Sequence, residues 1–394
     1  MQTAEASVAA GLHTAAAQQS LAVQAYSCEP ATPSMQLALL QHLGSSLRSV
    51  AFTCRHWVCG GDAPSAGFKA RWRSVLGQPA AATGALGRLR SLEVHGICKC
   101  GSVVIGHLQL PALSQLTRLR LPNSVPAQCL QQLPSSLQEL QVTVAEGSQQ
   151  LSLAHLTALT QLQLSGRYKL GSSDRLPASL TAATLLCGEL HLAYQCKSAS
   201  PPPNLAAESA AWQDLPLRQL SLIGVTVPAA VLQQLAELPA GLTSLELDSH
   251  TLMAGTRELL QTLGHLNLHT LEIADMPLGS IAQELPGDWR LNRQLLLQRL
   301  VLKHCNMSNM ATYLVLRACH GLRELSLFGN CGYPGSMDDE AFGSPHHEFV
   351  LSRLPHVQLP QLQWLDVRGT RVTPAGVAHL PGVKLLNDRQ VFAA

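Results

Sequence analysis

A short apolar pattern recurs along most of the chain: a leucine, two variable residues, a second leucine, one variable residue and a third apolar residue. In a strand, successive side chains point to opposite faces, so the second and third apolar residues are predicted to face a core. Copies of the pattern are centred on Leu92, Leu119, Leu140, Leu162, Leu220, Leu245, Leu271, Leu300, Leu325 and Leu365. Such self-similarity predicts a solenoid whose short strands stack into a parallel sheet.

The intervals between these centres fall mostly between 21 and 29 residues. By spelling and period, residues 86–386 resemble the leucine-rich repeat family. The resemblance implies an α/β fold, a horseshoe with a parallel β-sheet on its concave side and helices or irregular turns outside. In that family an asparagine, cysteine or threonine after the strand hydrogen-bonds the backbone of adjacent turns. Cys305, Asn330 and Thr370 occupy that place here.

Two longer intervals predict insertions, near residues 187–210 and 332–352. The first interval also holds a degenerate copy of the pattern, LTAATLLCGELHL, followed by a proline-rich stretch. The second insertion is predicted to be a polar loop thrown out between two regular repeats, with a solvated acidic tip at Asp338, Asp339 and Glu340. Apolar residues three and four apart predict outer helices at 231–238, 256–266 and 309–322.

The residues that flank each central leucine are predicted to line the concave face, where charge alternates along the chain. Phe328 and Trp364 are outward aromatics, and aromatic residues are enriched among interface hot spots, so we expect them to be anchors. An alternative is that the second insertion folds back and covers both. The predicted target-binding residues are Arg118, Arg120, Glu246, Asp248, Glu272, Arg299, Lys303, Phe328, Trp364, Asp366 and Arg368.

Composition narrows the class of protein. The chain has 394 residues, of which 46% are hydrophobic and 4% aromatic, so aliphatic side chains must fill the core. A net charge of +2 gives no reason to expect nucleic acid or an anionic membrane as partner. No apolar stretch approaches the roughly 18 residues that span a bilayer. The 11 scattered cysteines indicate reduced thiols, and alanine-rich residues 1–30 lack a basic leader and are expected to be disordered.

A search for catalytic chemistry is negative. The chain has no nucleotide-binding glycine motif, no nucleophile elbow and no H-E-x-x-H zinc motif. Cys98 and Cys100 lack a second cysteine pair at zinc-finger spacing, and His346-His347 lies in a turn-rich stretch without helical histidine spacing. We therefore expect no enzyme activity, no cofactor and no metal.

The segment before the repeats, residues 33–76, has apolar residues at helical spacing that end in Thr53-Cys54-Arg55-His56-Trp57. This segment resembles an F-box, with Pro33, Leu37 and Trp72 also at matching places. The resemblance implies a small α-helical segment that binds the Skp-type adaptor of a cullin ubiquitin ligase complex. The residues that would make this contact are Leu40, Leu43, Leu47, Val50, Cys54, Arg55 and Trp57.

Together the two resemblances imply a non-enzymatic substrate receptor of an SCF-type ubiquitin ligase, cytoplasmic or nuclear, whose repeats hold a protein target of unknown identity. The alternative is a scaffolding leucine-rich repeat protein, for instance on a cytoskeletal or ciliary assembly. In that case residues 33–76 would be only a cap on the first repeat, since solenoids need capped ends.

The two hypotheses differ in adaptor binding. The ligase hypothesis predicts that purified Skp-type adaptor is retained by the full chain in a pull-down, and that Leu43→Asp with Trp57→Ala abolishes retention while circular dichroism is unchanged. A folded wild-type chain that retains no adaptor would leave the segment as a cap.

Overall fold

The computed structural model describes residues 20–25, 48–54, 88–96, 113–144, 151–166, 175–186, 215–224, 241–248, 263, 266–276, 278, 296–317, 319–330, 337–342, 357–380 and 382–387. The chain divides into two compact units, Met1–Thr181 and Ala182–Ala394. Within the described residues each unit is a parallel β-solenoid with few helices. None of the helices described is long and apolar enough to cross a membrane.

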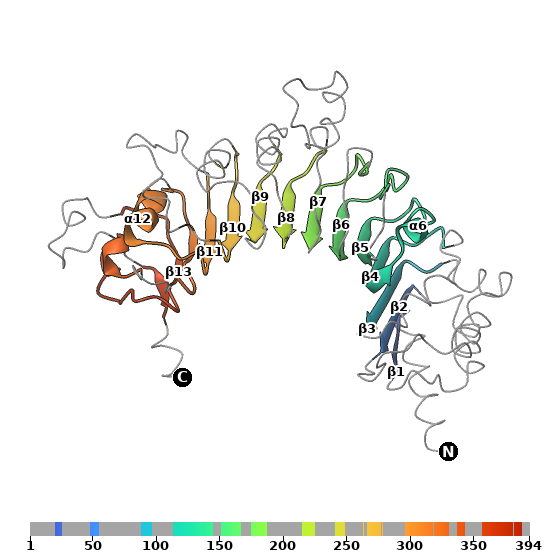
Figure 1. The fold of residues 1–394 in the computed structure, drawn as a ribbon, viewed down its shortest axis with the longest axis horizontal. Helices are drawn as coiled ribbons and strands as arrows, with labels where there is room; N and C mark the ends of the chain where they lie inside the picture. Colours follow the sequence, from blue (N-terminus) through green and yellow to red (C-terminus); the bar gives the residue numbers. More distant parts are fainter. Residues whose placement is uncertain are drawn as a thin grey trace, which may run out of the picture. The chain divides into compact units, whose positions relative to one another are not determined.

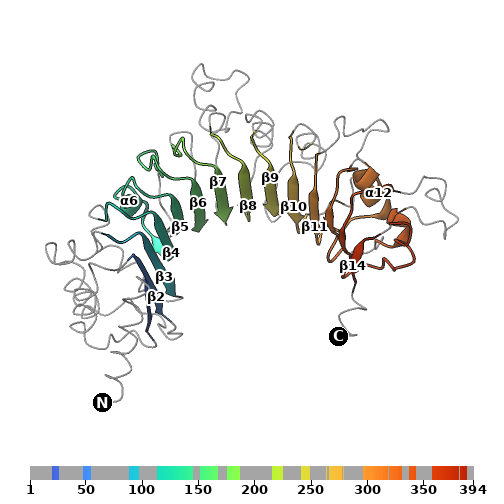
Figure 2. The same cartoon turned by 180° about the vertical axis from the view of Figure 1, so that it is seen from behind.

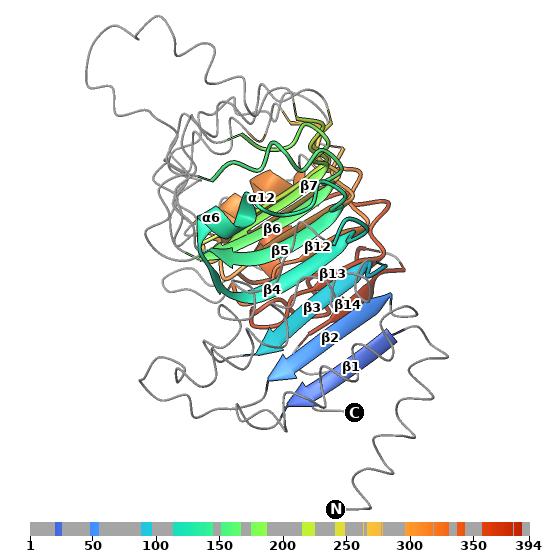
Figure 3. The ribbon, with the colours of Figure 1, turned by 90° about the vertical axis from the view of Figure 1, so that its right-hand side faces the viewer.

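The first unit is built from strands that lie in chain order, each parallel to the next (Figure 1). A one-turn helix, α6 (Ala127–Leu130), follows the fourth strand. The parallel arrows of the first four strands are clearest in Figure 3. The strands are β1 (Ser20–Ala25), β2 (Ser49–Cys54), β3 (Ser91–Gly96), β4 (Arg118–Val125), β5 (Glu139–Val144) and β6 (Gln161–Gly166).

The second unit continues the same construction (Figure 2). Its strands are β7 (Ala182–Leu186), β8 (Gln219–Ile223), β9 (Ser244–Asp248), β10 (Thr270–Ala274), β11 (Arg299–Lys303), β12 (Glu324–Ser326), β13 (Trp364–Asp366) and β14 (Lys384–Leu386). Helix α12 (Asn309–Arg317) follows β11, and the 3-10 helix η4 (Asp339–Phe342) follows β12 and packs against α12.

The second and third apolar positions of the repeated pattern face the core, as predicted, and the first position is buried with them. In the repeat of β12, Leu322, Leu325 and Leu327 are all fully buried. In-register pairing places Leu325 beside Leu300 on one neighbouring strand and beside Leu365 on the other. Equivalent leucines of successive repeats therefore form continuous columns, and burial of each column requires the repeats on both sides.

Several repeats have a residue with positive φ at the same place, five positions after the first strand residue and at or just beyond the end of the strand. These residues are Gly166, Gly224, Asp275, His304, Gly329 and Gly369. Glycine adopts this conformation without a steric penalty, and aspartate and histidine tolerate it better than most residues. Neighbouring turns are close here: a Cβ on Gly329 would lie 2.1 Å from Nδ1 of His304, and a Cβ on Gly369 would lie 3.0 Å from Cα of Gly329.

Asn330 ties two neighbouring turns together from inside the solenoid. Its side chain is fully buried, and its Oδ1 accepts hydrogen bonds from the backbone N–H of Cys305 at 2.9 Å and of Met307 at 3.3 Å. Its Nδ2 donates to the carbonyl oxygens of Leu302 and Leu327, both at 2.8 Å. The amide thus satisfies four backbone groups that would otherwise be buried without partners.

Cys305 and Thr370 occupy the equivalent place in the adjacent repeats, and Cys305 alone reaches the backbone of a neighbouring turn as expected. The Cys305 thiol lies 3.3 Å from the Ile273 carbonyl oxygen, which belongs to the preceding repeat. Thr370 instead bonds within its own turn, donating to the Val367 carbonyl at 2.6 Å and accepting from the Val372 N–H at 3.2 Å.

Two expectations about secondary structure are wrong, and one predicted helix is shorter than expected. Residues 20–25, expected to be disordered, form β1, and residues 49–54, expected to be helical, form β2. The pattern explains β2, because Leu47, Val50 and Phe52 spell the repeated phrase with valine and phenylalanine in place of two leucines. The helix expected at 309–322 is confirmed but ends at Arg317. The expected helix at 231–238 lies outside the described residues.

The degenerate repeat predicted before the first insertion is confirmed as β7, in which Ala183 and Leu185 are buried. The rest of that insertion lies outside the described residues. In the second insertion residues 337–342 are described, and Asp338 and Asp339, expected in a solvated tip, are partly buried and hydrogen-bonded to Asn309 and Thr373. Met337, Ala341 and Phe342 are fully buried, because η4 packs on α12 and fills the outer side of this repeat.

The Asn330 contacts generate a stability prediction. Asn330→Ala would leave buried N–H and C=O groups without partners, so we expect the free energy of unfolding to fall by about 3 kcal/mol or more. The measurement is urea denaturation of the full chain, followed by circular dichroism.

Asn306→Gly is the matched control. Asn306 is exposed and has a φ of 49°, which glycine adopts readily, so its replacement is expected to leave stability unchanged or slightly raised. Equal losses in the two variants would contradict the role given to Asn330.

Candidate functional site

The residues between the buried positions of each strand share one face of the sheet. We call this the polar face, and each unit has its own. In the second unit the polar face is defined by Ser244, Glu246, Asp248, Thr270, Glu272, Arg299, Lys303, Glu324, Trp364 and Asp366. Strand pairing sets equivalent positions side by side, as for Glu246 and Glu272. Side chains on neighbouring strands therefore interact directly.

In the first unit the predicted binding residues Arg118 and Arg120 form ion pairs with two carboxylates. Arg120 Nη2 donates to Glu139 Oε1 at 2.8 Å, and Arg120 Nε lies 3.9 Å from Glu93 Oε1. Arg118 Nε lies 3.0 Å from Glu139 Oε2 and 3.5 Å from Glu93 Oε1, without hydrogen-bond geometry. Two positive and two negative charges thus compensate each other on β3, β4 and β5.

In the second unit, β9 and β10 carry the acidic residues. The Glu246 carboxylate accepts a hydrogen bond of 2.7 Å from the Ser221 hydroxyl, and Glu272 forms an ion pair with Lys303 on the next strand. Asp248 Oδ1 is buried and has no hydrogen-bond partner among the described residues. Burial of an acceptor without a donor is unfavourable, so β9 is the least compensated strand of this face.

Two further ion pairs follow on β11 to β13. Arg299 Nη1 lies 3.0 Å from Glu324 Oε2, and both side chains are about half exposed. Asp366 is only 3% exposed. Arg368 satisfies it with two side-chain hydrogen bonds, from Nε at 2.9 Å and from Nη2 at 2.8 Å, and with its backbone N–H at 3.2 Å. The Asp366 carboxylate can remain buried because Arg368 donates three hydrogen bonds to it.

Phe328, one of the two predicted anchors, lies in a small cluster. The Arg368 guanidinium is 5.4 Å from the centre of the Phe328 ring, and the His304 ring meets the Phe328 ring edge to face at 5.1 Å. Phe328 and Trp364 are both half-buried. They remain accessible in part, and Leu296 is the large apolar residue that the described part of the chain exposes most, at 54%.

The buried thiols are set up for structure and not for reactivity. Burial raises the pKa of Cys305 to about 12, and the negative charges of Asp275 and Asp248 act in the same direction, while a backbone hydrogen bond from Met276 opposes them. Burial also raises the pKa of Cys319 to about 12 and raises that of the partly exposed Cys129. The thiolate is the nucleophile and metal ligand, so these neutral thiols are poor at either task.

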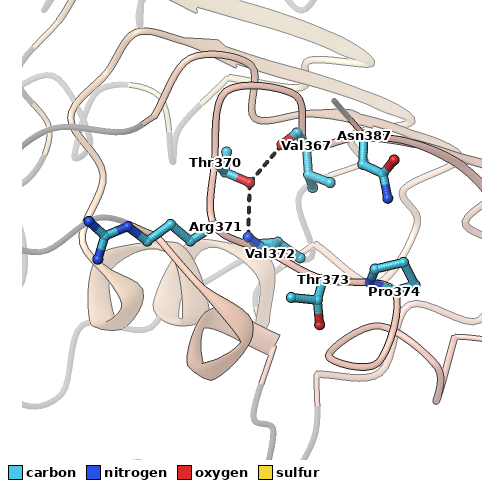
Figure 4. A pocket seen from close by; sticks show the side chains of 7 residues that line it. All are labelled: Val367, Thr370, Arg371, Val372, Thr373, Pro374 and Asn387. Carbon is cyan, nitrogen blue, oxygen red and sulfur yellow. Dashed lines mark hydrogen bonds between the residues drawn. The ribbon is translucent and has the colours of Figure 1, made fainter. Parts of the chain in front are cut away.

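A cavity of about 280 Å³ lies at the end of the second unit, lined by residues 370–374 with Val367 and Asn387 (Figure 4). Its lining holds no carboxylate, imidazole or thiol that could act as acid, base or nucleophile. The Thr370 hydroxyl at its wall is already hydrogen-bonded twice. Among the described residues no group of three or more histidine, cysteine, aspartate or glutamate side chains could hold a metal ion.

The structure therefore places the predicted target-binding residues of β4 in one unit and all the others in the second unit, on β9 to β13 or directly after a strand. Of the predicted adaptor-binding residues, Val50 and Cys54 lie on β2, and Leu40, Leu43, Leu47, Arg55 and Trp57 lie outside the described residues. Cys98, Cys100, His346 and His347 also lie outside them.

Sequence reasoning missed three partners of the face: Glu139, Ser221 and His304. A signal existed for Glu139, which occupies the same position before a central leucine as Arg118 on the preceding strand. His304 could have been found by alignment with Gly329 and Gly369, which mark the turn position. Ser221 carries no signal beyond its place on a strand.

The two arginine pairs predict different costs. Arg368→Ala would leave the buried Asp366 carboxylate without its side-chain donors, so we expect a loss of about 2 kcal/mol in unfolding free energy. Arg299→Ala breaks an exposed pair and should cost less than about 1 kcal/mol. Chemical denaturation of the two variants side by side is the measurement, and a larger loss for Arg299→Ala would contradict the burial argument.

A comparison with models of known protein families finds none that matches this chain, and a comparison with curated proteins finds no match.

Proposed function

We propose that this protein is a non-enzymatic interaction module of the leucine-rich repeat type, which binds a protein target on the polar face of its second unit. The observation that carries the proposal is the face itself. Charged and aromatic side chains from β9 to β13 project from strands whose opposite side is buried in a column of leucines, so the scaffold holds them in fixed order.

The repeat assignment has support in the hydrogen bonds of the turns. The leucine-rich repeat resemblance implies a polar residue after the strand that binds the backbone of adjacent turns. Asn330 makes four such bonds, and the Cys305 thiol reaches the carbonyl oxygen of Ile273 in the preceding repeat. These contacts are those that the resemblance predicts from sequence, and they recur with the apolar pattern.

The composition of the face favours a protein partner over a small molecule. Its polar groups are spread along several strands, as in an extended interface, whereas a small-molecule site gathers a few polar groups in one concave pocket. Partly exposed Phe328 and Trp364 offer the kind of aromatic anchor that dominates protein interfaces, beside charged groups such as Glu246 that can set orientation.

A scaffold role is the form of this proposal that we favour. Strand β2, paired with β1 and β3, extends the parallel sheet into residues where the F-box resemblance implies helices, which weighs against a helical adaptor site at 49–54. A ubiquitin-ligase receptor remains a hypothesis for the residues outside the described part of the chain, with adaptor binding as its test.

The polar face is tested with the full chain as bait for its cellular partners. The face variant combines Glu246→Gln, Asp248→Asn and Trp364→Ala, which remove charge and aromatic surface without touching the leucine columns. A partner that binds the face should lose at least about tenfold in affinity, because each anchor contributes 1 kcal/mol or more.

Arg317→Gln is the matched control. Arg317 is an exposed charged residue at the end of α12, away from the polar face, so its replacement should leave affinity unchanged. A partner that binds the face variant as tightly as the wild type would exclude the polar face of the second unit as its site.

A further inference from the structure

The second insertion is fastened to the rest of the unit by Asp339 at the start of η4. One carboxylate oxygen of Asp339 accepts the backbone N–H of Thr373 at 2.6 Å, and the other accepts the Thr373 hydroxyl at 2.7 Å. The carboxylate also lies tightly against the backbone: a Cβ on Gly376 would be 2.2 Å from Asp339 Oδ1. We call this contact of Asp339 with Thr373 and Gly376 the clasp.

The clasp holds a short segment that is fixed on its other side as well. Asp338 forms two hydrogen bonds with Asn309, the first residue of α12. Asn309 Nδ2 donates to Asp338 Oδ1 at 2.7 Å, and the Asp338 N–H donates to Asn309 Oδ1 at 2.9 Å. The Arg371 N–H donates to the Met337 carbonyl at 2.9 Å. Residues 337–342 therefore bridge α12 and the turn after β13.

Thr373, like Asp339, is partly accessible in the clasp. It lies in a stretch without helix or strand, and it lines the cavity together with the next residue, Pro374 (Figure 4). A threonine followed by proline is the acceptor dipeptide of proline-directed protein kinases. Elsewhere in the chain this dipeptide type occurs at Thr32, Ser200 and Ser344, which lie outside the described residues.

We propose that Thr373 is a phosphorylation site for a proline-directed kinase, and that its phosphorylation opens the clasp. In the transfer, Thr373 Oγ forms a bond to the γ-phosphorus of ATP while the bond from that phosphorus to the β–γ bridging oxygen breaks. ADP leaves with the electron pair, and the hydroxyl proton passes to the kinase's catalytic base.

The charge of the product explains the opening. Phosphothreonine carries about −1.5 to −2 charges at pH 7 and has lost the hydroxyl proton that bonds to Asp339. The phosphate would stand against the Asp339 carboxylate, and like charges at this distance repel strongly. The Asp339 carboxylate also lies against Gly376, which limits its movement, so we expect η4 to separate from the turn after β13.

The experiment treats the full chain with a purified proline-directed kinase and Mg-ATP, and locates phosphate by mass spectrometry. A synthetic peptide of residues 368–379 shows whether the isolated sequence is an acceptor. We expect phosphate on Thr373 in both. Phosphorylation of the peptide but not of Thr373 in the folded chain, or of neither, would overturn the proposal.

Hydrogen exchange then tests the opening. Amides of residues 338–342 and the Thr373 N–H should exchange about tenfold faster or more in the phosphorylated chain, because a charged hydrogen bond and its packing are lost. Thr373→Val removes the acceptor hydroxyl but adds no charge and keeps the backbone bond to Asp339. After kinase treatment this variant should keep the exchange of its untreated form. A phosphorylated Thr373 with unchanged exchange in residues 338–342 would disprove the clasp mechanism.

Discussion

Every other feature of the molecule depends on the register of its parallel strands. Because Leu300, Leu325 and Leu365 pair directly across β11, β12 and β13, one apolar position becomes a column and the alternate position becomes a row of polar side chains. A shift of one residue would turn the leucines to the polar face and the charges into the core. The register of the strands thus determines both the core and the candidate site.

The row of polar side chains is less highly charged than its sequence indicates. Lys303, Arg299 and Arg368 each form an ion pair with a carboxylate on their own or a neighbouring strand, so most of the alternating charge is neutralised within the protein. What distinguishes one part of the face from another is an uncompensated residue such as Asp248, the aromatic surface of Trp364 and, just beyond β12, that of Phe328. A partner would recognise these uncompensated and aromatic residues more than the charge pattern as a whole.

The repeated phrase predicted the strands because it records burial, and burial depends only on spacing along the strand. The α12 helix was predicted from a different pattern, apolar residues three and four apart, and the backbone contacts of Asn330 from the family resemblance alone. The repeated phrase failed where it is spelled with other residues, as at Val50 and Phe52 of β2, and where alanine hides a short strand, as at β1. The packing of η4 could not be predicted from the sequence, because Asp339 and Thr373 are far apart along the chain and no local pattern indicates their contact.

The stacked turns at His304, Gly329 and Gly369 have a consequence for how the chain can change in length. A Cβ on Gly369 would meet the backbone of Gly329, and a Cβ on Gly329 would meet the His304 side chain, so an added side chain collides with the neighbouring turn. An extra residue at that point would have to displace every later repeat, whereas one added beyond Asn330 displaces none. The second long insertion begins on the permissive side, after Asn330. The tight turn at Gly329 thus keeps the spacing of the polar face constant on either side of that insertion.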